Sequence, residues 1–281
     1  MKSSVFKLLA LVFYWSGLLP VLNSLAGTLQ FAGEGEQSFK FPFLKRRMCR
    51  PIQILTYHRV NDEHDFLFPA TPIRVFEEQM LHISKRYHVC ALEEAVERFQ
   101  KKDLPPNAVA ITFDDGYRDN FLHAFPVVRN LSLPMTIFLA TDAIGTGRTL
   151  WHDRVFSAFR ETKASNLTGF DPSIVGVPLG SLPQRQLAME KVLAILRRLD
   201  EAERNQRISV LCHCLAVEER RVDPDLMLTW DDVKLMSRDH VSFGSHTASH
   251  PILARISEEE TEAQLVRSCE AIRQHLGRRP V

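Results

Sequence analysis

Short apolar runs recur between residues 52 and 245, and each has the composition of a buried β-strand. They are rich in β-branched and aromatic residues, and turn-forming or polar residues bound them. The predicted strands are Ile52–Tyr57, Ala108–Phe113, Met135–Ala140 and Val241–Ser245, and Tyr87–Leu92 fits the same pattern less closely.

Helical patterns fill the spaces between these strands. Thr71 and Pro72 form a helix start, because proline is favoured at the first helical position, and residues 93–100 and 117–130 also have helical spacing. Pro126 is expected to bend the last of these helices. The alternation of strand and helix predicts an α/β fold with a mostly parallel sheet, either open or closed into a barrel.

This alternation breaks over residues 160–230, where glycine, proline, serine and asparagine interrupt the chain. Two helices are predicted there, near residues 184–199 and 201–216, and no strand. We interpret the region near 160–228 as a helical insertion that forms a lid or flank of the active site.

The end of the chain carries a further helix. Ser257 and Glu260 form a capping box for it, and Gly277 is suited to ending it. In an α/β fold such a helix leads into another strand, but only residues 278–281 come after it. The sequence therefore predicts a domain, residues 51–281, that is incomplete at its C-terminus.

The first 50 residues differ from the rest in charge and hydropathy. They carry seven Lys and Arg residues and two acidic ones, and residues 8–33 form an uncharged run that begins strongly apolar. Three interpretations stay open: a signal peptide, a membrane anchor, or a helix packed on the domain. The first two predict a membrane-associated or extracytoplasmic protein. The basic residues 45–47 beyond the run fit a location at the cytoplasmic face instead.

Composition narrows the class of protein. Hydrophobic residues make up 45% of the 281 residues, which is enough for a buried core. Lys and Arg number 35 and Asp and Glu 34, so the net charge of +1 gives no support for a nucleic-acid-binding protein. Five cysteines are too few for a scaffold built on disulfides. Cys212 and Cys214 lie on different faces of a predicted helix, with no second pair, which favours packing over metal binding.

Polar clusters directly follow three of the predicted strands. They are residues 57–59 (YHR), residues 114–117 (DDGY) and residues 245–250 (SHTASH). Active sites of parallel α/β folds form at the carboxyl ends of strands, so the three clusters are expected to converge on one face.

The converging side chains suit a metal-dependent hydrolase. His246 and His250 are four residues apart, so in a helical turn both imidazoles would face one way. With one carboxylate they make a three-ligand site, with an open position, for zinc or another divalent metal. Asp114 and Asp115 can then divide the work, because one binds the metal while the other acts as a base on the metal-bound water. Gly116 allows a sharp turn that aims the following amides at an oxyanion.

Two ordered motifs carry a resemblance to a known family. Thr112–Tyr117 (TFDDGY) resembles the first motif of the NodB-homology polysaccharide deacetylases (carbohydrate esterase family 4), and His246–His250 (HTASH) resembles their second. Leu55–Val60 (LTYHRV) is similar to the family's opening strand, and Leu150–Asp153 (LWHD) lies where many bacterial members have similar residues. The resemblance covers residues 51–281.

The resemblance implies a distorted (β/α) barrel, incomplete here at the C-terminus, that removes N-acetyl groups from a glycan such as chitin, peptidoglycan or an exopolysaccharide. By motif position it implies that Asp114 is the catalytic base and that the metal ligands are Asp115, His246 and His250. Zinc is the expected metal, and the Tyr117 amide is expected to help hold the oxyanion.

His58 and Trp151 are further candidates for contact with the substrate. His58 either lines the site or is a structural histidine held by hydrogen bonds. Trp151 and Trp230 either stack on sugar rings or pack in the core, and packing is the favoured interpretation.

The chain also departs from the family. An Arg-x-Pro-Tyr-like segment that positions the base is absent, as is a late histidine that protonates the leaving amine, and residues 278–281 (RRPV) lack the aromatic residue. Two alternatives to an active deacetylase therefore stay open. One is an inactive, truncated relative that binds metal or glycan without turnover, and the other is a different barrel metallohydrolase, such as a phosphoesterase.

Overall fold

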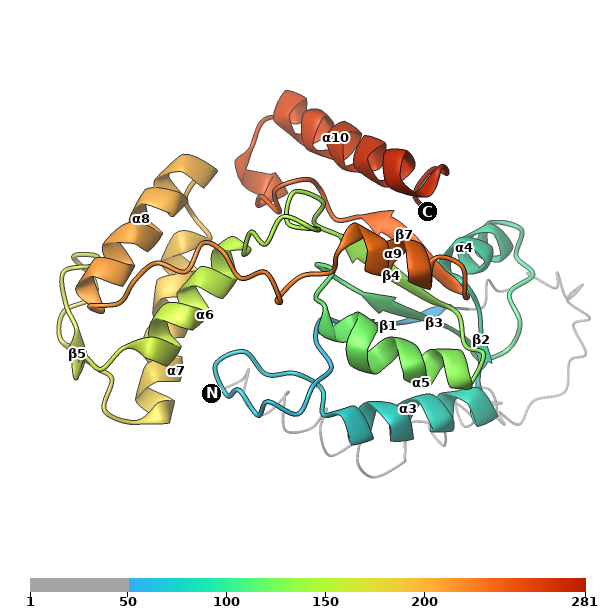
Figure 1. Cartoon of the computed structure of the whole chain (residues 1–281), viewed down its shortest axis with the longest axis horizontal. Helices are drawn as coiled ribbons and strands as arrows, with labels where there is room; N and C mark the ends of the chain where they lie inside the picture. Colours follow the sequence, from blue (N-terminus) through green and yellow to red (C-terminus); the bar gives the residue numbers. More distant parts are fainter. Residues whose placement is uncertain (1–50) are drawn as a thin grey trace, which may run out of the picture. The chain divides into compact units, whose positions relative to one another are not determined.

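The structure, a computed structural model, describes residues 51–281 and is built around a parallel sheet (Figure 1). The strand order is β1-β3-β4-β7, and β2 also pairs with β3. The α/β class predicted from the sequence is confirmed, and the described strands follow an open path from β1 to β7. The bounds are β1 (Gln53–Tyr57), β2 (His88–Val89), β3 (Ala108–Phe113), β4 (Met135–Leu139) and β7 (Val241–Ser245).

The sheet buries the apolar runs that predicted it. All six residues of β3 are buried, because this strand has neighbours on both edges and is covered on both faces. Phe113 and Ile137 are paired across β3 and β4 in the middle of the main hydrophobic core. The register also aligns strand ends, with Tyr57 opposite Phe113 and Leu139 opposite Ser245. The segments that leave the carboxyl ends of β1, β3 and β7 therefore emerge at one edge of the sheet.

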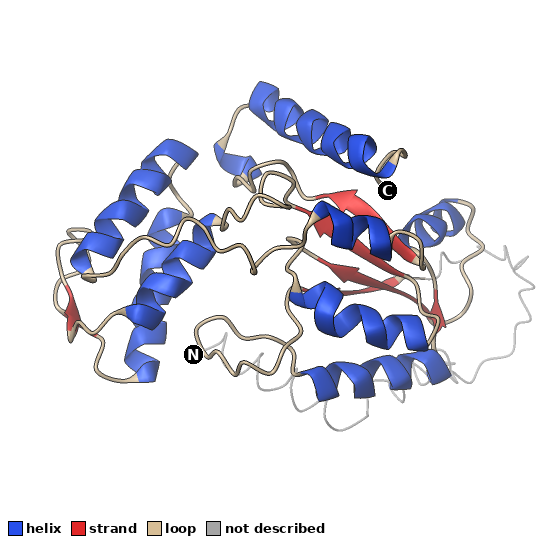
Figure 2. Cartoon of the chain, in the orientation of Figure 1, coloured by secondary structure: helices blue, strands red, loops and turns tan. Residues whose placement is uncertain are grey.

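Helices alternate with these strands, as Figure 2 shows. α10 packs against β7 and α9, and α3 packs against α5. The predicted ends of α10 are confirmed: Ser257 accepts a hydrogen bond from the Glu260 amide, and Gly277 closes the helix in the left-handed conformation. The bounds are α3 (Ile73–Arg86), α4 (Leu92–Gln100), α5 (Phe125–Asn130), α9 (Trp230–Met236) and α10 (Glu258–Leu276).

The predicted bend at Pro126 takes the form of a wider turn. Residues Asn120–Ala124 form a short π-helix, η1, which runs directly into α5. Proline lacks the N–H that an α-helix would use at this point, and a π turn is one of the ways a helix accommodates that loss.

Three helices after β4 have a hydrophobic core of their own. Figure 1 shows α6, α7 and α8 side by side, and their apolar faces enclose Val155, Phe159, Val192 and Leu211. α7 and α8 were predicted, whereas α6 was not. The bounds are α6 (Trp151–Glu161), α7 (Leu182–Leu196) and α8 (Glu201–Cys214).

The expectation of no strand in this region was wrong in one detail. β5 (Asn166–Leu167) and β6 (Val177–Pro178) form a two-stranded antiparallel ribbon. Strands of two residues are too short to show an alternating pattern in the sequence, and proline is tolerated at such an edge.

The apolar run at residues 8–33 lies outside the described residues, so its three interpretations stay predictions, as does the boundary at residue 50. Within residues 51–281, no helix combines the length and the hydropathy needed to cross a membrane. The residues after α10 return to the sheet, where the Val281 amide donates to the Phe243 carbonyl of β7 at 3.1 Å.

Candidate active site

The segment after β3 turns sharply at two consecutive left-handed residues. Asp115 has φ 74° and Gly116 has φ 88°. A Cβ on Gly116 would lie 2.8 Å from Leu139 Cδ2 and 2.9 Å from Ile144 Cδ1. The conformation therefore favours glycine, and a larger residue would also have to displace the ends of these two buried side chains. The turn places Asp114 and Asp115 at the edge of the sheet where β1 and β7 also end.

Asp115, His246 and His250 come together as predicted. Asp115 Oδ1 lies 3.4 Å from His246 Nε2 and 3.2 Å from His250 Nε2. One ligand atom from each of the three residues lies within 4.8 Å of the others. The structure thus gathers two imidazoles and one carboxylate, a donor set suited to zinc and to other divalent metals.

The protonation states fit a cation at this point. Burial raises the pKa of Asp115, but the close imidazoles of His250, His152 and His246 outweigh it and bring the pKa to about 2. Burial also lowers the pKa of His246, so its ring is neutral at pH 7. Asp115 Oδ1 is buried and accepts no hydrogen bond of good geometry among the described residues. A buried carboxylate oxygen that faces two imidazole nitrogens without a hydrogen bond of good geometry suits a metal ion.

The expectation of a helical turn between the two histidines was wrong. Residues 246–250 form an irregular loop, in which Thr247 has φ 67° and His250 has φ 58°. A left-handed β-branched threonine is unusual, and it occurs where surrounding contacts hold it. The ligand spacing therefore comes from the shape of the loop.

Gln264 of α10 holds this loop in place through hydrogen bonds. Its side-chain oxygen accepts hydrogen bonds from the amides of Ala248 (3.0 Å) and Ser249 (2.9 Å). Its Nε2 donates to Ser249 Oγ at 3.0 Å, and the whole residue is buried. Inside the loop, the His250 amide donates to Thr247 Oγ1 at 3.2 Å.

Asp114 lies beside the ligand group with a different electrostatic character. Burial raises its pKa, and the charge of Asp115 acts in the same direction, while His246 and His58 offset part of the shift. His58 Nε2 lies 4.0 Å from Asp114 Oδ2, and the His58 side chain is 52% exposed. The pKa values of the two adjacent aspartates are thus shifted in opposite directions. Asp115 stays ionised, and Asp114 is the better proton acceptor.

Tyr117 is part of a buried network that the sequence did not predict. Its hydroxyl donates to Asp153 Oδ1 at 2.9 Å and lies 2.9 Å from His152 Nε2. His152 Nε2 is in turn 3.9 Å from Asp115 Oδ2, and burial lowers the pKa of His152. His152 therefore lies beside the candidate metal ligand Asp115, and Tyr117 links it to Asp153. The LWHD segment was the only sequence signal for them.

The backbone around Tyr117 forms hydrogen bonds with residues 226–228. The neighbouring amide of Arg118 donates to Leu226, and the Gly116 carbonyl accepts from Leu228. Within residues 51–281 the Tyr117 amide has no acceptor of its own. Tyr117 as a whole is buried, so the part of its amide in holding an oxyanion stays a prediction.

The tryptophans follow the packing interpretation in part. The Trp230 ring stacks on His275 of α10 with centroids 4.0 Å apart, so it packs between helices. Trp151 lies against the core of α6–α8 and under the guanidinium of Arg204, 5.0 Å from its ring centroid. Its ring centroid is 5.5 Å from that of His152, so it also borders the candidate site.

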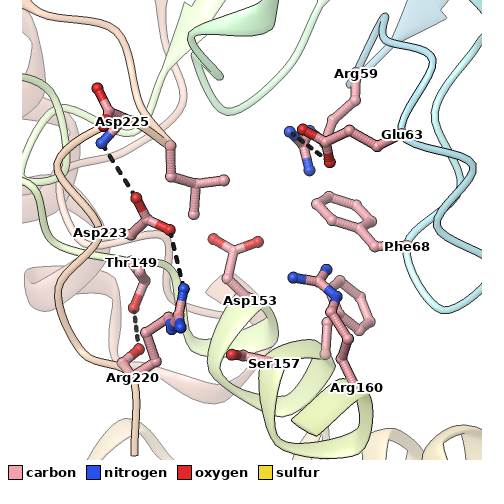
Figure 3. Close-up of a pocket in the computed structure, with 12 residues that line it drawn as sticks. Arg59, Glu63, Phe68, Thr149, Asp153, Ser157, Arg160, Arg220, Asp223 and Asp225 are labelled. Carbon is pink, nitrogen blue, oxygen red and sulfur yellow. Dashed lines mark hydrogen bonds and ion pairs between the residues drawn. The ribbon is translucent and has the colours of Figure 1, made fainter.

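A cavity of about 210 Å³ lies against the same network. Figure 3 shows the Asp153 carboxylate near the middle of the lining residues, with Phe68 across from it between Arg59 and Arg160. Arg59 is held by Asp119 at 2.7 Å, and Arg160 is paired with Asp65. The arginines of this cavity already have carboxylate partners, and the three candidate metal ligands do not line it.

Comparison with known proteins defines the class. The sequence profile of the Polysaccharide deacetylase family matches residues 101–281, so the chain belongs to this family. It is 30% identical over 105 residues to YxkH of Bacillus subtilis (strain 168), whose name places it among the polysaccharide deacetylases. That match covers 37% of this chain and 37% of the relative, so the chain spans just over a third of that relative's length.

A solved structure shows the same fold. The deacetylase PplD of Streptococcus pyogenes, in complex with acetate, aligns with a TM-score of 0.50 at 16% sequence identity. The alignment covers 82% of this chain and 71% of the other. The predicted relation to NodB-type folds is thus confirmed at the level of architecture.

Proposed function

We propose that this protein removes N-acetyl groups from an N-acetylated polysaccharide and uses a divalent metal held by Asp115, His246 and His250. Zinc is the proposed metal. Membership of the family supports the reaction class. The observation that carries the proposal is Asp115 Oδ1, which is buried, lies 3.4 Å and 3.2 Å from two imidazole nitrogens, and has no hydrogen bond of good geometry among the described residues.

The roles of the residues follow from their surroundings. When bound, a divalent metal polarises the acetamide carbonyl and lowers the pKa of water at the same site. Asp114 takes the proton from the attacking water, and its raised pKa brings it closer to that of an effective base at neutral pH. Asp115 stays ionised because its pKa is about 2. The Tyr117 amide donates to the carbonyl oxygen as negative charge develops there.

The reaction balances as an amide hydrolysis. The water oxygen bonds to the acetyl carbon, the carbon–nitrogen bond breaks, and the proton that Asp114 took from the water passes to the leaving nitrogen. The products are acetate and the glycan amine. The exposed His58 side chain lies 4.0 Å from the Asp114 carboxylate, on the side from which a sugar would approach. We assign it to substrate contact.

Metal titration of the chelator-treated protein tests the ligand set. Zinc binding measured by calorimetry should be lost in Asp115→Ala, His246→Ala and His250→Ala. His213→Ala, an exposed histidine of α8, is the matched control and should bind zinc normally. Unchanged binding in all three ligand variants would disprove the site.

Acetate release from N-acetylglucosamine oligosaccharides tests the activity. We expect release by the zinc-loaded protein and its loss in Asp114→Asn. Zinc binding without any acetate release would instead identify an inactive relative. Hydrolysis of phosphoesters in place of acetamides would identify a different metallohydrolase.

A further inference from the structure

A second cavity, of about 170 Å³, opens beside the ligand loop between the first turns of α6 and α8. Its walls include Trp151 and Arg154 from α6, Arg204 from α8, and Ser249. Trp151 directly precedes His152, and Ser249 directly precedes His250. The cavity therefore borders the candidate active site, although the three proposed metal ligands do not line it.

Arg204 is the unusual member of this wall. Its side chain is only 2% exposed, yet within residues 51–281 it forms no ion pair with a carboxylate. Its Nε has no acceptor, and its NH1 reaches only the Leu199 carbonyl, at 3.5 Å. Arginine stays protonated in proteins, so this is a buried positive charge with no carboxylate in ion-pair contact. The charges of Glu201 and Asp200 act on it from further away, and its guanidinium lies 5.0 Å from the Trp151 ring centroid. Such a charge is costly unless a partner is present.

Two other residues of the wall also carry unpaired donors. Arg154 Nε and Trp151 Nε1 are both buried and have no acceptor among the described residues. Together with Arg204 Nε, every unsatisfied buried side-chain atom in this wall is an N–H donor. An acceptor group with two oxygens suits such a set of donors.

The electrostatics of the cavity agree with an anion. The first turns of α6 and α8 face it, and helix N-termini are electropositive. Two carboxylates are present in the wall, Asp142 and Glu201, and the charge of Glu201 also acts on Arg204. Asp142 pairs with Arg267 at 2.6 Å, and Glu201 accepts a hydrogen bond from Ser249 Oγ at 3.2 Å.

We propose that this cavity binds a carboxylate group, held by Arg204 and the indole N–H of Trp151. Its source rests on the proposed function: either the acetate released by the reaction, or the carboxylate of a uronic acid unit in the glycan. Both present the planar pair of oxygens that a guanidinium recognises.

The test is a titration of the chelator-treated full chain with acetate, D-glucuronate or glucose at constant ionic strength. Intrinsic tryptophan fluorescence reports binding because Trp151 lies in the wall. We expect a saturable response to at least one carboxylate and none to glucose. A response to acetate alone assigns the cavity to the product, and a response to glucuronate assigns it to the substrate.

Variants make the assignment specific. Arg204→Met should abolish the response, whereas Arg198→Met, an exposed arginine on the link between α7 and α8, should keep it. Without carboxylate, Arg204→Met should melt at the same temperature as the wild type or higher, because it removes an unpaired buried charge. Trp151→Phe, which keeps an aromatic ring and loses the donor, should weaken binding several-fold and serves if Arg204→Met does not fold. Because it also removes the fluorescent reporter, its binding is measured by calorimetry beside the wild type.

Two results would overturn the proposal: no saturable response of the wild type to either carboxylate, or equal loss in Arg198→Met and Arg204→Met. The outcome is independent of catalysis. Asp115→Asn should keep the carboxylate response, so failure of the deacetylase proposal would not remove it.

Discussion

Gln264 and Ser249 are joined by two hydrogen bonds that run in opposite directions. The Ser249 amide donates to Gln264 Oε1 at 2.9 Å, and Gln264 Nε2 donates back to Ser249 Oγ at 3.0 Å. The pair fastens the loop that carries His246 and His250 to α10. The helix that follows the loop thereby sets the position of two candidate metal ligands.

Gln264→Ala should therefore weaken metal binding without removing a ligand. We expect a loss of about 10-fold in zinc affinity, because groups that orient ligands typically contribute on this scale. Calorimetric titration of the chelator-treated protein measures it. Gln274→Ala, an exposed glutamine on the same helix, is the control and should leave the affinity unchanged. Equal affinities for the two variants would refute the positioning role.

Changing Asp114 or Asp115 to asparagine should have different effects on zinc binding and on acetate release. Asp114→Asn should keep zinc binding and lose acetate release by about 10²–10⁴-fold, the usual effect of removing a general base. Asp115→Asn should lose zinc binding itself, because an amide is a poor replacement for an anionic ligand. Calorimetry and an acetate assay on the same samples distinguish the two. Loss of zinc binding in both variants would contradict the division of roles.

Gly116→Ala should destabilise the fold through two separate causes. The left-handed φ of 88° costs about 1–2 kcal/mol for a residue with a Cβ, and the contacts with Leu139 and Ile144 add an overpacking cost of about 1–3 kcal/mol. Gly176 also has a positive φ, of 63°, but open space around it. Gly176→Ala should therefore show the backbone cost alone. Urea unfolding of both variants measures the difference, and equal losses would argue against the close packing.

Glu219 should make stability depend on pH. Burial raises its pKa, but hydrogen bonds from Arg221 and Ser209 and the charge of Arg154 outweigh this and hold the pKa below the usual 4.5. A carboxylate with a lowered pKa stabilises the folded state above its unfolded-state pKa. That contribution is lost as the pH falls through the folded-state value.

Thermal unfolding of Glu219→Gln beside the wild type tests this contribution. The variant should melt several degrees lower at pH 7, and the gap should narrow below about pH 4.5, where the unfolded state takes up the proton first. Glu218→Gln, at the adjacent position, is the control. A gap that stays constant across this pH range would mean that Glu219 acts through packing and not through its charge.

The sheet and the convergence of the site were predictable because both depend on local patterns. The AVAITF run is apolar throughout, as a central parallel strand must be, and the DDGY and SHTASH clusters come where strands end. Parallel strands bring such ends to one edge of the sheet. The ligand set could therefore be inferred without any contact being known.

The parts that could not be predicted depend on long-range contacts. α6 begins after Leu150, a poor N-cap, and Asp153 supplies the capping bond to the Leu150 amide. No sequence signal marks that start, so His152 was not placed beside Asp115. The loop from His246 to His250 was misjudged for the same reason, since its left-handed residues are held by Gln264, fifteen residues further along the chain.

The left-handed backbone at Asp115 and His250 also bears on how the protein acquires its metal. A chain that holds its donor atoms in unusual backbone conformations has already met the entropic cost of assembling them during folding. The metal then binds to a site that is already formed in the folded protein. In zinc fingers, by contrast, metal binding drives folding. We expect the metal-free protein to keep its fold and to accept several divalent ions. The supply of metals in the cell would then decide which ion occupies the site.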